Sequence, residues 1–266
     1  MSYSNNNFDV IVVGGGHAGY EAALASSRMG TRTALITLDR NAIGRMSCNP
    51  SIGGIAKSHL VFELDALGGE MARNTDYTGI QFRVLNTRKG PAVQANRAQC
   101  DKKAFSARIR AVLEQEKNMI LIEDMVNALW VEGGRLQGVV TAGGMKYAAK
   151  AVVIATGTFL NGTIHIGKKS WDAGRIEEKA AHELSASLKL AGFRLGRLKT
   201  GTPPRLHKDS INYAAMQEQP GLEPPPLFSF AARQEWKMFH VEHPPGQPRD
   251  GGPLFHVEQS GNPLKP

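Results

Sequence analysis

The chain has only two cysteines in 266 residues, Cys48 and Cys100. They lie far apart, and the sequence holds no C-x-x-C and no H-E-x-x-H spacing, so the common zinc-site patterns are excluded. We therefore predict no metal site. Sparse cysteine is typical of the reducing cytoplasm rather than of disulfide-rich secreted proteins.

Long apolar runs are also lacking. No stretch approaches the roughly 18 uninterrupted apolar residues that a membrane-spanning helix requires. The short run Val10 to Val13 follows the polar residues Asn5 to Asn7 instead of a basic region, so it does not resemble a secretory signal. The sequence predicts a cytoplasmic protein without membrane association.

Acidic residues are in deficit, with 24 Asp and Glu against 32 Lys and Arg, a net charge of +8 and a pI near 9.6. Such a chain attracts polyanions, including nucleic acids. Two interpretations stay open for the main basic series, which either faces phosphates or lines the solvated face of a helix. The series comprises Arg83, Arg88, Lys89, Arg97, Lys102, Lys103, Arg108 and Arg110.

Glycine is abundant where it matters, in the segment FDVIVVGGGHAG from Phe8 to Gly19. An apolar strand leads directly into a G-x-G-x-x-G pattern, and a helix over about His17 to Met29 follows. In dinucleotide-binding folds the first glycine permits the tight turn, the second lets backbone approach a pyrophosphate, and the third lets the helix pack on the strand. The helix N-terminus then faces the phosphates. The predicted cofactor-binding residues are Gly14, Gly15, Gly16, His17, Ala18 and Gly19.

A second strand is predicted over Thr33 to Leu38, and Asp39 follows it. An acid at this place can bind a ribose hydroxyl. Asp39 can equally begin the turn into Arg40 and Asn41. The residues leave both interpretations open.

The remaining chain has the pattern of an α/β protein with an antiparallel insertion. Gly-Gly pairs separate three short strands like hairpin turns, and a continuous apolar run after them suits a strand buried on both faces. A later helix should end at Gly192. The predicted elements are a helix Ala104 to Glu116, strands Met119 to Ile122, Asn127 to Val131, Leu136 to Thr141, Met145 to Ala149 and Ala151 to Ala155, and a helix Ile176 to Ala191.

Four longer motifs carry a family resemblance: Ile43 to Met71 with its SCNPSIGG block, Gly79 to Val93, Lys150 to Gly167, and Gly196 to Leu206. Together they resemble the MnmG/GidA family over about Phe8 to Phe230. The resemblance implies a Rossmann-like FAD-binding domain of the two-dinucleotide-binding flavoprotein type. It also implies that FAD binds at Gly14 to Gly19, and that Thr156 and Gly157 return the chain to the FAD. A purely structural turn is the alternative for those two residues.

The family resemblance also implies a function. Complete members add a carboxymethylaminomethyl group to carbon 5 of the tRNA wobble uridine, as homodimers acting with the GTPase MnmE, and NADH recharges the FAD. A related folate- and FAD-dependent tRNA uracil-5 methyltransferase is the main alternative. The family usually has a Gly/Pro-containing stretch where this chain has Arg175 to Ala181, so no cofactor contact is carried over there.

Cys48 is the predicted catalytic residue. It precedes Asn49-Pro50-Ser51, which we expect to introduce a helix near Ile52, and a thiol near a helix N-terminus with cations close by can become reactive. The resemblance implies that Cys48 acts on the uracil as nucleophile or proton donor. A small buried packing residue is the alternative, and that is how Cys100 is interpreted. The loop Lys199 to Arg205 could hold an anionic substrate or a tRNA phosphate.

The family pattern stops after Phe230. We expect residues 231–266 to form a disordered tail outside the family, and the chain to be a truncated N-terminal fragment, inactive or even pseudogene-like. The tail repeats a hexapeptide at Met238 to His243 and Leu254 to Gln259. Both copies can be encoded by perfect DNA palindromes, which suggests translated non-coding DNA with sites for a dimeric DNA-binding protein. Codons that break the symmetry in both copies would remove this hypothesis.

Overall fold

The computed structural model describes residues 6–235. The predicted tail beyond residue 235 and its hexapeptide repeat lie outside the described residues. The chain divides into two compact units. Of the described residues, unit 1 comprises 6–45 and 106–200, and unit 2 comprises 46–105 and 201–235.

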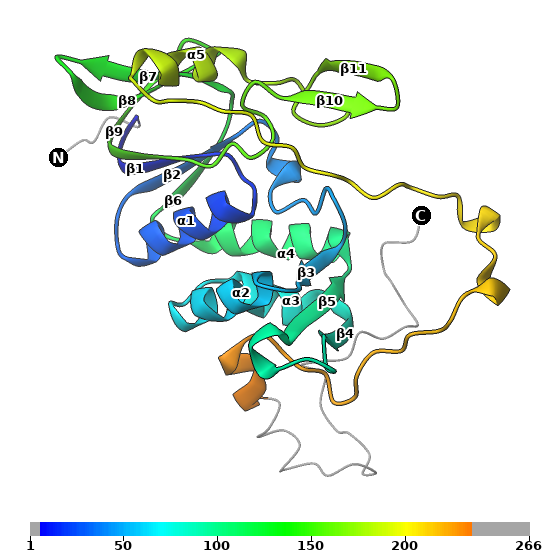
Figure 1. Cartoon of the computed structure of the whole chain (residues 1–266). Helices are drawn as coiled ribbons and strands as arrows, with labels where there is room; N and C mark the ends of the chain where they lie inside the picture. The colour runs from blue at the N-terminus through cyan, green and yellow to red at the C-terminus, as the bar shows by residue number, and fades with distance from the viewer. Residues whose placement is uncertain (1–5, 236–266) are drawn as a thin grey trace, which may run out of the picture. The chain divides into compact units, whose positions relative to one another are not determined.

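A six-stranded mixed sheet forms the centre of unit 1 (Figure 1). Four strands run parallel in the order β6-β2-β1-β9, and β8 and β7 continue the sheet antiparallel. Helix α1 connects β1 to β2 as the crossover of a parallel pair requires. This confirms the predicted α/β class with a Rossmann-like sheet and an antiparallel insertion. The elements are β1 (Asn7–Val13), α1 (His17–Arg28), β2 (Thr33–Thr37), β6 (Met119–Glu123), β7 (Val126–Glu132), β8 (Arg135–Thr141) and β9 (Lys146–Ile154).

Strand β9 differs from the prediction in two ways. The two strands predicted on either side of Lys150 are one continuous strand, which pairs with β8 at its beginning and with β1 along its length. The strand is also not buried on both faces, since Ala151 is exposed and Val153 is 39% exposed. Helix α1 packs on β1 and β2 and makes few contacts with β9. The apolar sequence of the strand was therefore not enough to predict that a helix covers it.

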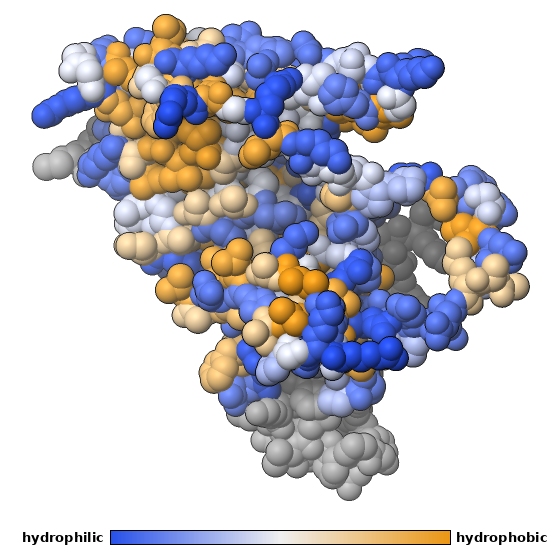
Figure 2. Space-filling model, viewed as in Figure 1, coloured by the Kyte–Doolittle hydropathy of each residue, from blue (hydrophilic) through white to orange (hydrophobic). Residues whose placement is uncertain are grey.

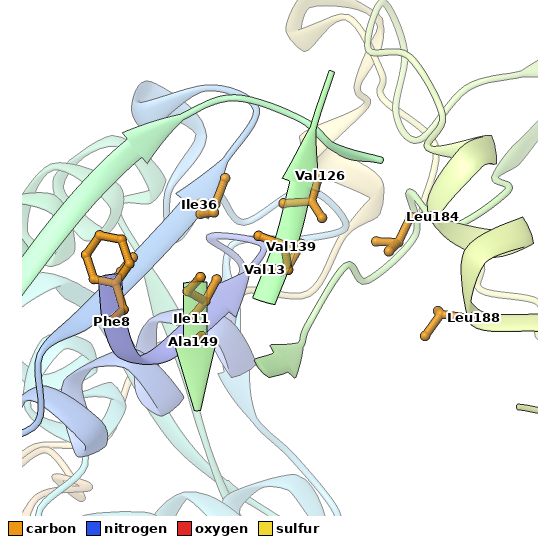
Figure 3. Packing of buried hydrophobic residues seen from close by; sticks show 10 residues of the cluster. Phe8, Ile11, Val13, Ile36, Val126, Val139, Ala149, Leu184 and Leu188 are labelled. Carbon is orange, nitrogen blue, oxygen red and sulfur yellow. The ribbon is translucent and has the colours of Figure 1, made fainter. Parts of the chain in front are cut away.

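One hydrophobic core cluster of unit 1 lies between the sheet and helix α5 (His182–Leu190). Phe8, Ile11 and Val13 of β1 meet side chains of the insertion, and Leu184 and Leu188 of α5 complete the cluster (Figure 3). These two leucines stand four residues apart and therefore share one face of the helix. Burial of this apolar surface stabilises the unit.

Helix α5 begins later than predicted, at His182 instead of Ile176. The preceding residues form an irregular segment in which Glu177 has a φ of +66°. The predicted end is confirmed, because Gly192 has a φ of +91° and donates its N–H to the Lys189 carbonyl, while Phe193 donates to the Leu188 carbonyl. This pair of bonds is a Schellman motif.

Unit 2 contains a three-stranded antiparallel sheet in the order β3-β5-β4. The helix predicted near Ile52 is wrong, because Ser51–Gly53 form β3 and the next helix begins at Lys57. Gly53 and Gly54 have φ values of +91° and +100°, which a right-handed helix excludes. The elements are β3 (Ser51–Gly53), α2 (Lys57–Ala66), α3 (Met71–Thr78), β4 (Gly79–Leu85) and β5 (Ala95–Cys100).

Shorter elements complete the described chain. Helix α4 (Lys102–Gln115) confirms the helix predicted over Ala104 to Glu116, and the boundary between the units falls within it. A small hairpin consists of β10 (Thr163–Ile166) and β11 (Lys169–Asp172). Four 3-10 turns are η1 (Arg40–Ala42), η2 (Pro91–Val93), η3 (Lys208–Ser210) and η4 (Tyr213–Ala215).

The segment around Phe228 is anchored within unit 2 by two carboxylates. Asp76 of α3 accepts the backbone N–H groups of Phe228 and Ser229 at 2.9 and 2.7 Å, and Asp65 of α2 accepts that of Phe230 at 2.7 Å. The Phe228 ring is fully buried and stacks on Phe62 with centroids 5.5 Å apart. The chain after the Pro-rich stretch is therefore an integral part of this unit.

Residues 6–235 contain neither a candidate membrane-spanning helix nor a candidate metal centre. No helix in that range combines the length and apolarity needed to cross a membrane. The same range contains no group of three or more His, Cys, Asp or Glu side chains arranged to hold a metal ion.

Candidate cofactor-binding site

The glycine motif forms a tight turn between β1 and α1. Gly14 has a φ of +107°, and a Cβ there would lie 2.4 Å from the Ala155 carbonyl oxygen. A Cβ on Gly19 would lie 1.7 Å from the Gly14 carbonyl oxygen. These two positions admit only glycine, because the turn packs directly against the end of β9 and the first turn of α1 packs against the turn.

Gly16 is different. It caps α1 with a φ of −72°, and a Cβ built there would meet nothing within 4 Å. No side chain caps this helix end, and its first turn carries no acidic residue. The N–H groups and the positive end of the helix dipole therefore face open space that suits an anion. Ala18 is exposed on the first turn of α1.

A cavity opens beside this turn, and its lining comes from the carboxyl ends of the parallel strands. The end of β1 with the glycine turn, the end of β2 with Asp39, and the turn after β9 with Thr156 and Gly157 all line it. In open α/β sheets ligands bind at this edge. The structure thus brings Gly14, Gly15, Gly16, Asp39, Thr156 and Gly157 together, although the sequence separates them widely.

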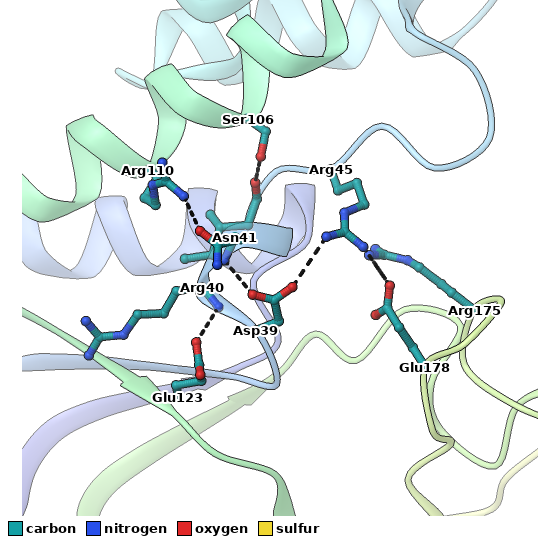
Figure 4. A network of polar contacts seen from close by, with 10 residues as sticks. Asp39, Arg40, Asn41, Arg45, Ser106, Arg110, Glu123, Arg175 and Glu178 are labelled. Carbon is teal, nitrogen blue, oxygen red and sulfur yellow. Dashed lines mark hydrogen bonds and ion pairs between the residues drawn. The ribbon is translucent and has the colours of Figure 1, made fainter. Parts of the chain in front are cut away.

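Asp39 takes part in a polar network at one side of the cavity (Figure 4). Its Oδ1 accepts the N–H of Asn41 at 2.7 Å and so caps the turn η1, and its Oδ2 lies 3.3 Å from Nη2 of Arg45. Asp39 therefore begins the turn, one of the two predicted roles, and it also lines the cavity.

Sequence reasoning missed the cationic part of this cavity. Arg175 and Glu178 line it, and the Glu178 carboxylate forms an ion pair with Arg45 at 2.7 Å. The Arg175 guanidinium lies over the Phe159 ring at 5.2 Å from the centroid. Burial lowers the pKa of Arg175. The sequence did not predict this contribution, because Arg175 to Ala181 depart from the family pattern and no cofactor contact was assigned to them.

His17 is the first residue of α1, and its ring makes an edge-on contact with Tyr20 at 5.7 Å between centroids. Burial lowers its pKa, and the nearby Arg175 adds to the effect. A neutral imidazole follows at pH 7. His17 is not among the residues that line the cavity beside the glycine turn.

Cys48 belongs to unit 2 and lies in the loop before β3. Its thiol is half-buried and donates to the Gly201 carbonyl at 3.3 Å. Arg205 donates to the carbonyl oxygens of Ser47 and Cys48 at 3.1 and 3.0 Å. Two motifs that the sequence places about 150 residues apart, SCNP and TGTPPR, are therefore in contact. Cys100 is buried in β5, as expected of a structural residue.

The family model described as "Glucose inhibited division protein A" matches residues 9–242. The chain belongs to this GidA family. The matched range extends past Phe230, where the resemblance was expected to stop, and its last residues lie outside the described ones.

Individual relatives of this GidA-family chain agree. It is 56% identical over 225 residues to the tRNA uridine 5-carboxymethylaminomethyl modification enzyme MnmG of Sulfurihydrogenibium sp., a match that covers 84% of the chain and 36% of that enzyme. The enzyme of the same name from Pelobacter propionicus is 54% identical over 227 residues, again covering 36% of the relative and 85% of the chain. The crystal structure of Aquifex aeolicus GidA superposes with a TM-score of 0.82 at 50% identity, covering 86% of this chain and 38% of that one. The chain thus spans little more than a third of the length of these relatives.

Proposed function

We propose that this chain provides the FAD-binding part of an enzyme that adds a carboxymethylaminomethyl group to carbon 5 of the tRNA wobble uridine. In this proposal tRNA is the substrate, the GTPase MnmE is the partner, the complete enzyme is a homodimer, NADH is the reductant and the location is cytoplasmic. The names of the GidA-family relatives support the substrate class. The remaining assignments rest on the family resemblance.

The observation that carries the proposal is the cavity at the carboxyl ends of β1, β2 and β9. Open space at Gly16 leaves room for a pyrophosphate at the N-terminus of α1, and Gly14 and Gly19 permit the close packing of the turn against β9 and α1. Asp39 lies at the end of β2 with a carboxylate that can accept a ribose hydroxyl. The donor and acceptor groups present therefore fit FAD.

Each group has a distinct task toward the bound flavin. The backbone N–H groups at the start of α1 bind the pyrophosphate, Asp39 orients the ribose, and the Thr156-Gly157 turn closes the cavity from the β9 side. FAD supplies the redox chemistry, whereas the protein supplies binding, orientation and electrostatics.

Cys48 is the proposed catalytic residue toward uracil, as nucleophile or proton donor. Arg205 donates a hydrogen bond to the backbone carbonyl of Cys48 and so holds this loop in place. The Cys48 thiol donates to the Gly201 carbonyl. A preorganised thiol loses less conformational freedom when it reacts than a mobile one.

Two measurements test the proposed function. Purified chain should carry or take up FAD, seen as a flavin absorbance spectrum after gel filtration. In a strain that lacks this gene together with the sequence directly downstream, tRNA nucleoside analysis should show loss of the carboxymethylaminomethyl group at the wobble uridine. Loss of 5-methyluridine instead would support the methyltransferase alternative, and unchanged tRNA would contradict both.

A further inference from the structure

The outer face of the small sheet in unit 2 carries two arginines side by side. Arg83 of β4 and Arg97 of β5 are direct cross-strand partners in the antiparallel register. Gln81 and Gln99 form the neighbouring pair on the same face, and Phe82 and Ala98 point to the buried face instead. Side chains of directly opposed residues lie close enough to interact, and like charges there destabilise the sheet.

Neither guanidinium has a carboxylate partner among residues 6–235. Arg83 donates to the side-chain oxygen of Gln219 at 2.8 Å, and Arg97 donates to the Ser51 hydroxyl at 3.2 Å. Both acceptors are neutral, so they position the guanidiniums without compensating their charge. Both arginines are also half-buried, which reduces the screening of their repulsion by water.

A polar cavity of about 310 Å³ lies over this pair. Besides the two arginines, the side chains of Gln81, Asn86, Gln99 and Gln219 line it. Every guanidinium has five N–H donors in a fixed fork, and amide side chains add further donors. The cavity thus offers many donors and two positive charges.

We propose that Arg83 and Arg97 form a binding site for a phosphate group. A phosphate has enough oxygens to accept bonds from both guanidiniums at once, whereas a carboxylate has two oxygens and is matched by a single guanidinium fork. Two positive charges also match the nearly double negative charge of inorganic phosphate or a phosphate monoester, and they exceed the single negative charge of an RNA phosphodiester. Bound phosphate converts the unfavourable cross-strand pair into a stabilising one.

The site is distinct from the FAD cavity, since all its residues belong to unit 2. Its phosphate comes either from a small molecule or from the backbone of RNA. Arg88 and Lys89, in the exposed loop that follows β4, provide positive charge near the end of the same hairpin. The RNA source rests on the proposed function, and the small-molecule source does not.

Thermal unfolding in sodium phosphate and in sodium chloride of equal ionic strength tests the site directly. Phosphate should raise the Tm of the full chain above its value in chloride, in part through the general stabilisation by a kosmotropic salt. Arg83→Gln and Arg97→Gln should each make this difference smaller than it is in the parent chain. In chloride the two variants should be as stable as the parent chain or more stable, because the repulsion is relieved. Arg73→Gln is the matched control, since Arg73 is an exposed arginine of α3 outside the cavity.

A purely structural role for these arginines predicts the opposite pattern. The variants would then lose stability in chloride, and the difference between phosphate and chloride would stay as large as in the parent chain. That result overturns the proposal. If a glutamine variant fails to fold, Arg97→Lys keeps the charge but loses the fork, and it should weaken the phosphate effect.

The source of the phosphate is decided with an unmodified tRNA transcript. The dissociation constant is measured as a function of KCl concentration, and each glutamine variant should reduce the slope of log Kd against log[KCl] by about 1 if the site contacts the RNA backbone. An unchanged slope, together with a reduced effect of inorganic phosphate in the variants, assigns the site to a small phosphate compound. Failure of FAD binding leaves both measurements interpretable, because neither involves the flavin.

Discussion

At the scale of single residues, the glycine motif contains two kinds of glycine. Gly19 is required by the fold, because a Cβ there would overlap the Gly14 carbonyl oxygen, whereas nothing in the chain opposes a Cβ on Gly16. The sequence pattern alone does not distinguish them. Substitutions at Gly16 and at Gly19 can therefore test cofactor binding and folding separately.

Gly16→Val should therefore abolish FAD binding, because the branched side chain occupies the space of the pyrophosphate, and it should lower the Tm of the flavin-free chain only slightly, through the poorer helix cap. Gly19→Ala should lower the Tm by several degrees in the absence of flavin. Flavin content and thermal unfolding of both variants check this. Normal flavin content in Gly16→Val would remove the assignment of FAD to this turn.

The two thiols should differ in reactivity. Burial raises the pKa of Cys100 to about 12, so its reactive thiolate form is scarce in the folded chain. Cys48 is half-buried in a loop. A colorimetric thiol reagent at pH 8 should label one cysteine in the native chain and two after denaturation, and Cys48→Ser should remove the native reaction. Rapid labelling of Cys48→Ser would show that unit 2 opens readily.

Asp76 should make stability depend on pH. Burial raises its pKa to about 7, against the bonds from Phe228 and Ser229 and the charge of Arg233, which lower it. The folded chain therefore keeps a proton that the unfolded chain releases between about pH 4 and 7, and stability falls as the pH rises through this window, by at most about 4 kcal/mol.

Asp76→Asn removes the titratable carboxyl group. It also replaces one of the two oxygens that accept the N–H groups of Phe228 and Ser229. The variant should be less stable than the parent chain at pH 4.5, and the gap should narrow by pH 7.5. Urea unfolding at both values measures the gap. A gap that is constant or wider at pH 7.5 would show that the carboxylate is ionised in the folded chain throughout.

At the scale of elements, helix α5 depends on how it ends. Gly192 adopts a left-handed conformation, and nothing within 4 Å would contact a Cβ there. Gly192→Ala should therefore cost about 1 kcal/mol of stability through backbone strain alone. Gly196→Ala is the control, because Gly196 has neither a positive φ nor close neighbours. Equal unfolding midpoints in urea for the two variants would contradict the prediction.

At the scale of the whole molecule, the chain spans 36% of the length of the MnmG relatives. Its surface includes exposed hydrophobic side chains such as Val131, Met145 and Val153, and Figure 2 shows hydrophobic residues gathered below α5 on the visible face. Contiguous exposed apolar surface promotes association. The 266 residues by themselves are therefore expected to aggregate more readily than a full-length relative.

The same comparison predicts no activity from these residues alone. Expressed in a strain that lacks the wobble-modifying enzyme, the 266-residue chain should fail to restore the modified nucleoside, and a full-length relative should restore it. Nucleoside analysis of bulk tRNA measures this. Restoration by the 266 residues would show that the remainder of the relatives is dispensable.

The sequence by itself determined the local elements and the glycine turn. The strand before Gly14, helix α1 and the cap at Gly192 follow from apolar periodicity and from the conformational freedom of glycine, which act over a few residues. The family could be identified for the same reason, since its motifs are continuous in sequence. The predicted start of helix α5 was wrong, because Ile176 to Ala181 form an irregular segment before the helix.

Only the tertiary structure decided which distant residues meet. Strand β3 replaced the expected helix because Gly53 pairs with Arg97 of β5, more than 40 residues later. The entry of Arg175 into the cavity, the contact between Cys48 and Gly201, and the opposition of Arg83 and Arg97 likewise depend on chain reversals that local pattern does not encode. Which strands pair over long range depends on how the faces of helices and sheets pack together. The arginines of the basic series could therefore be counted from the sequence. The sequence did not show that Arg83 and Arg97 would lie opposite each other.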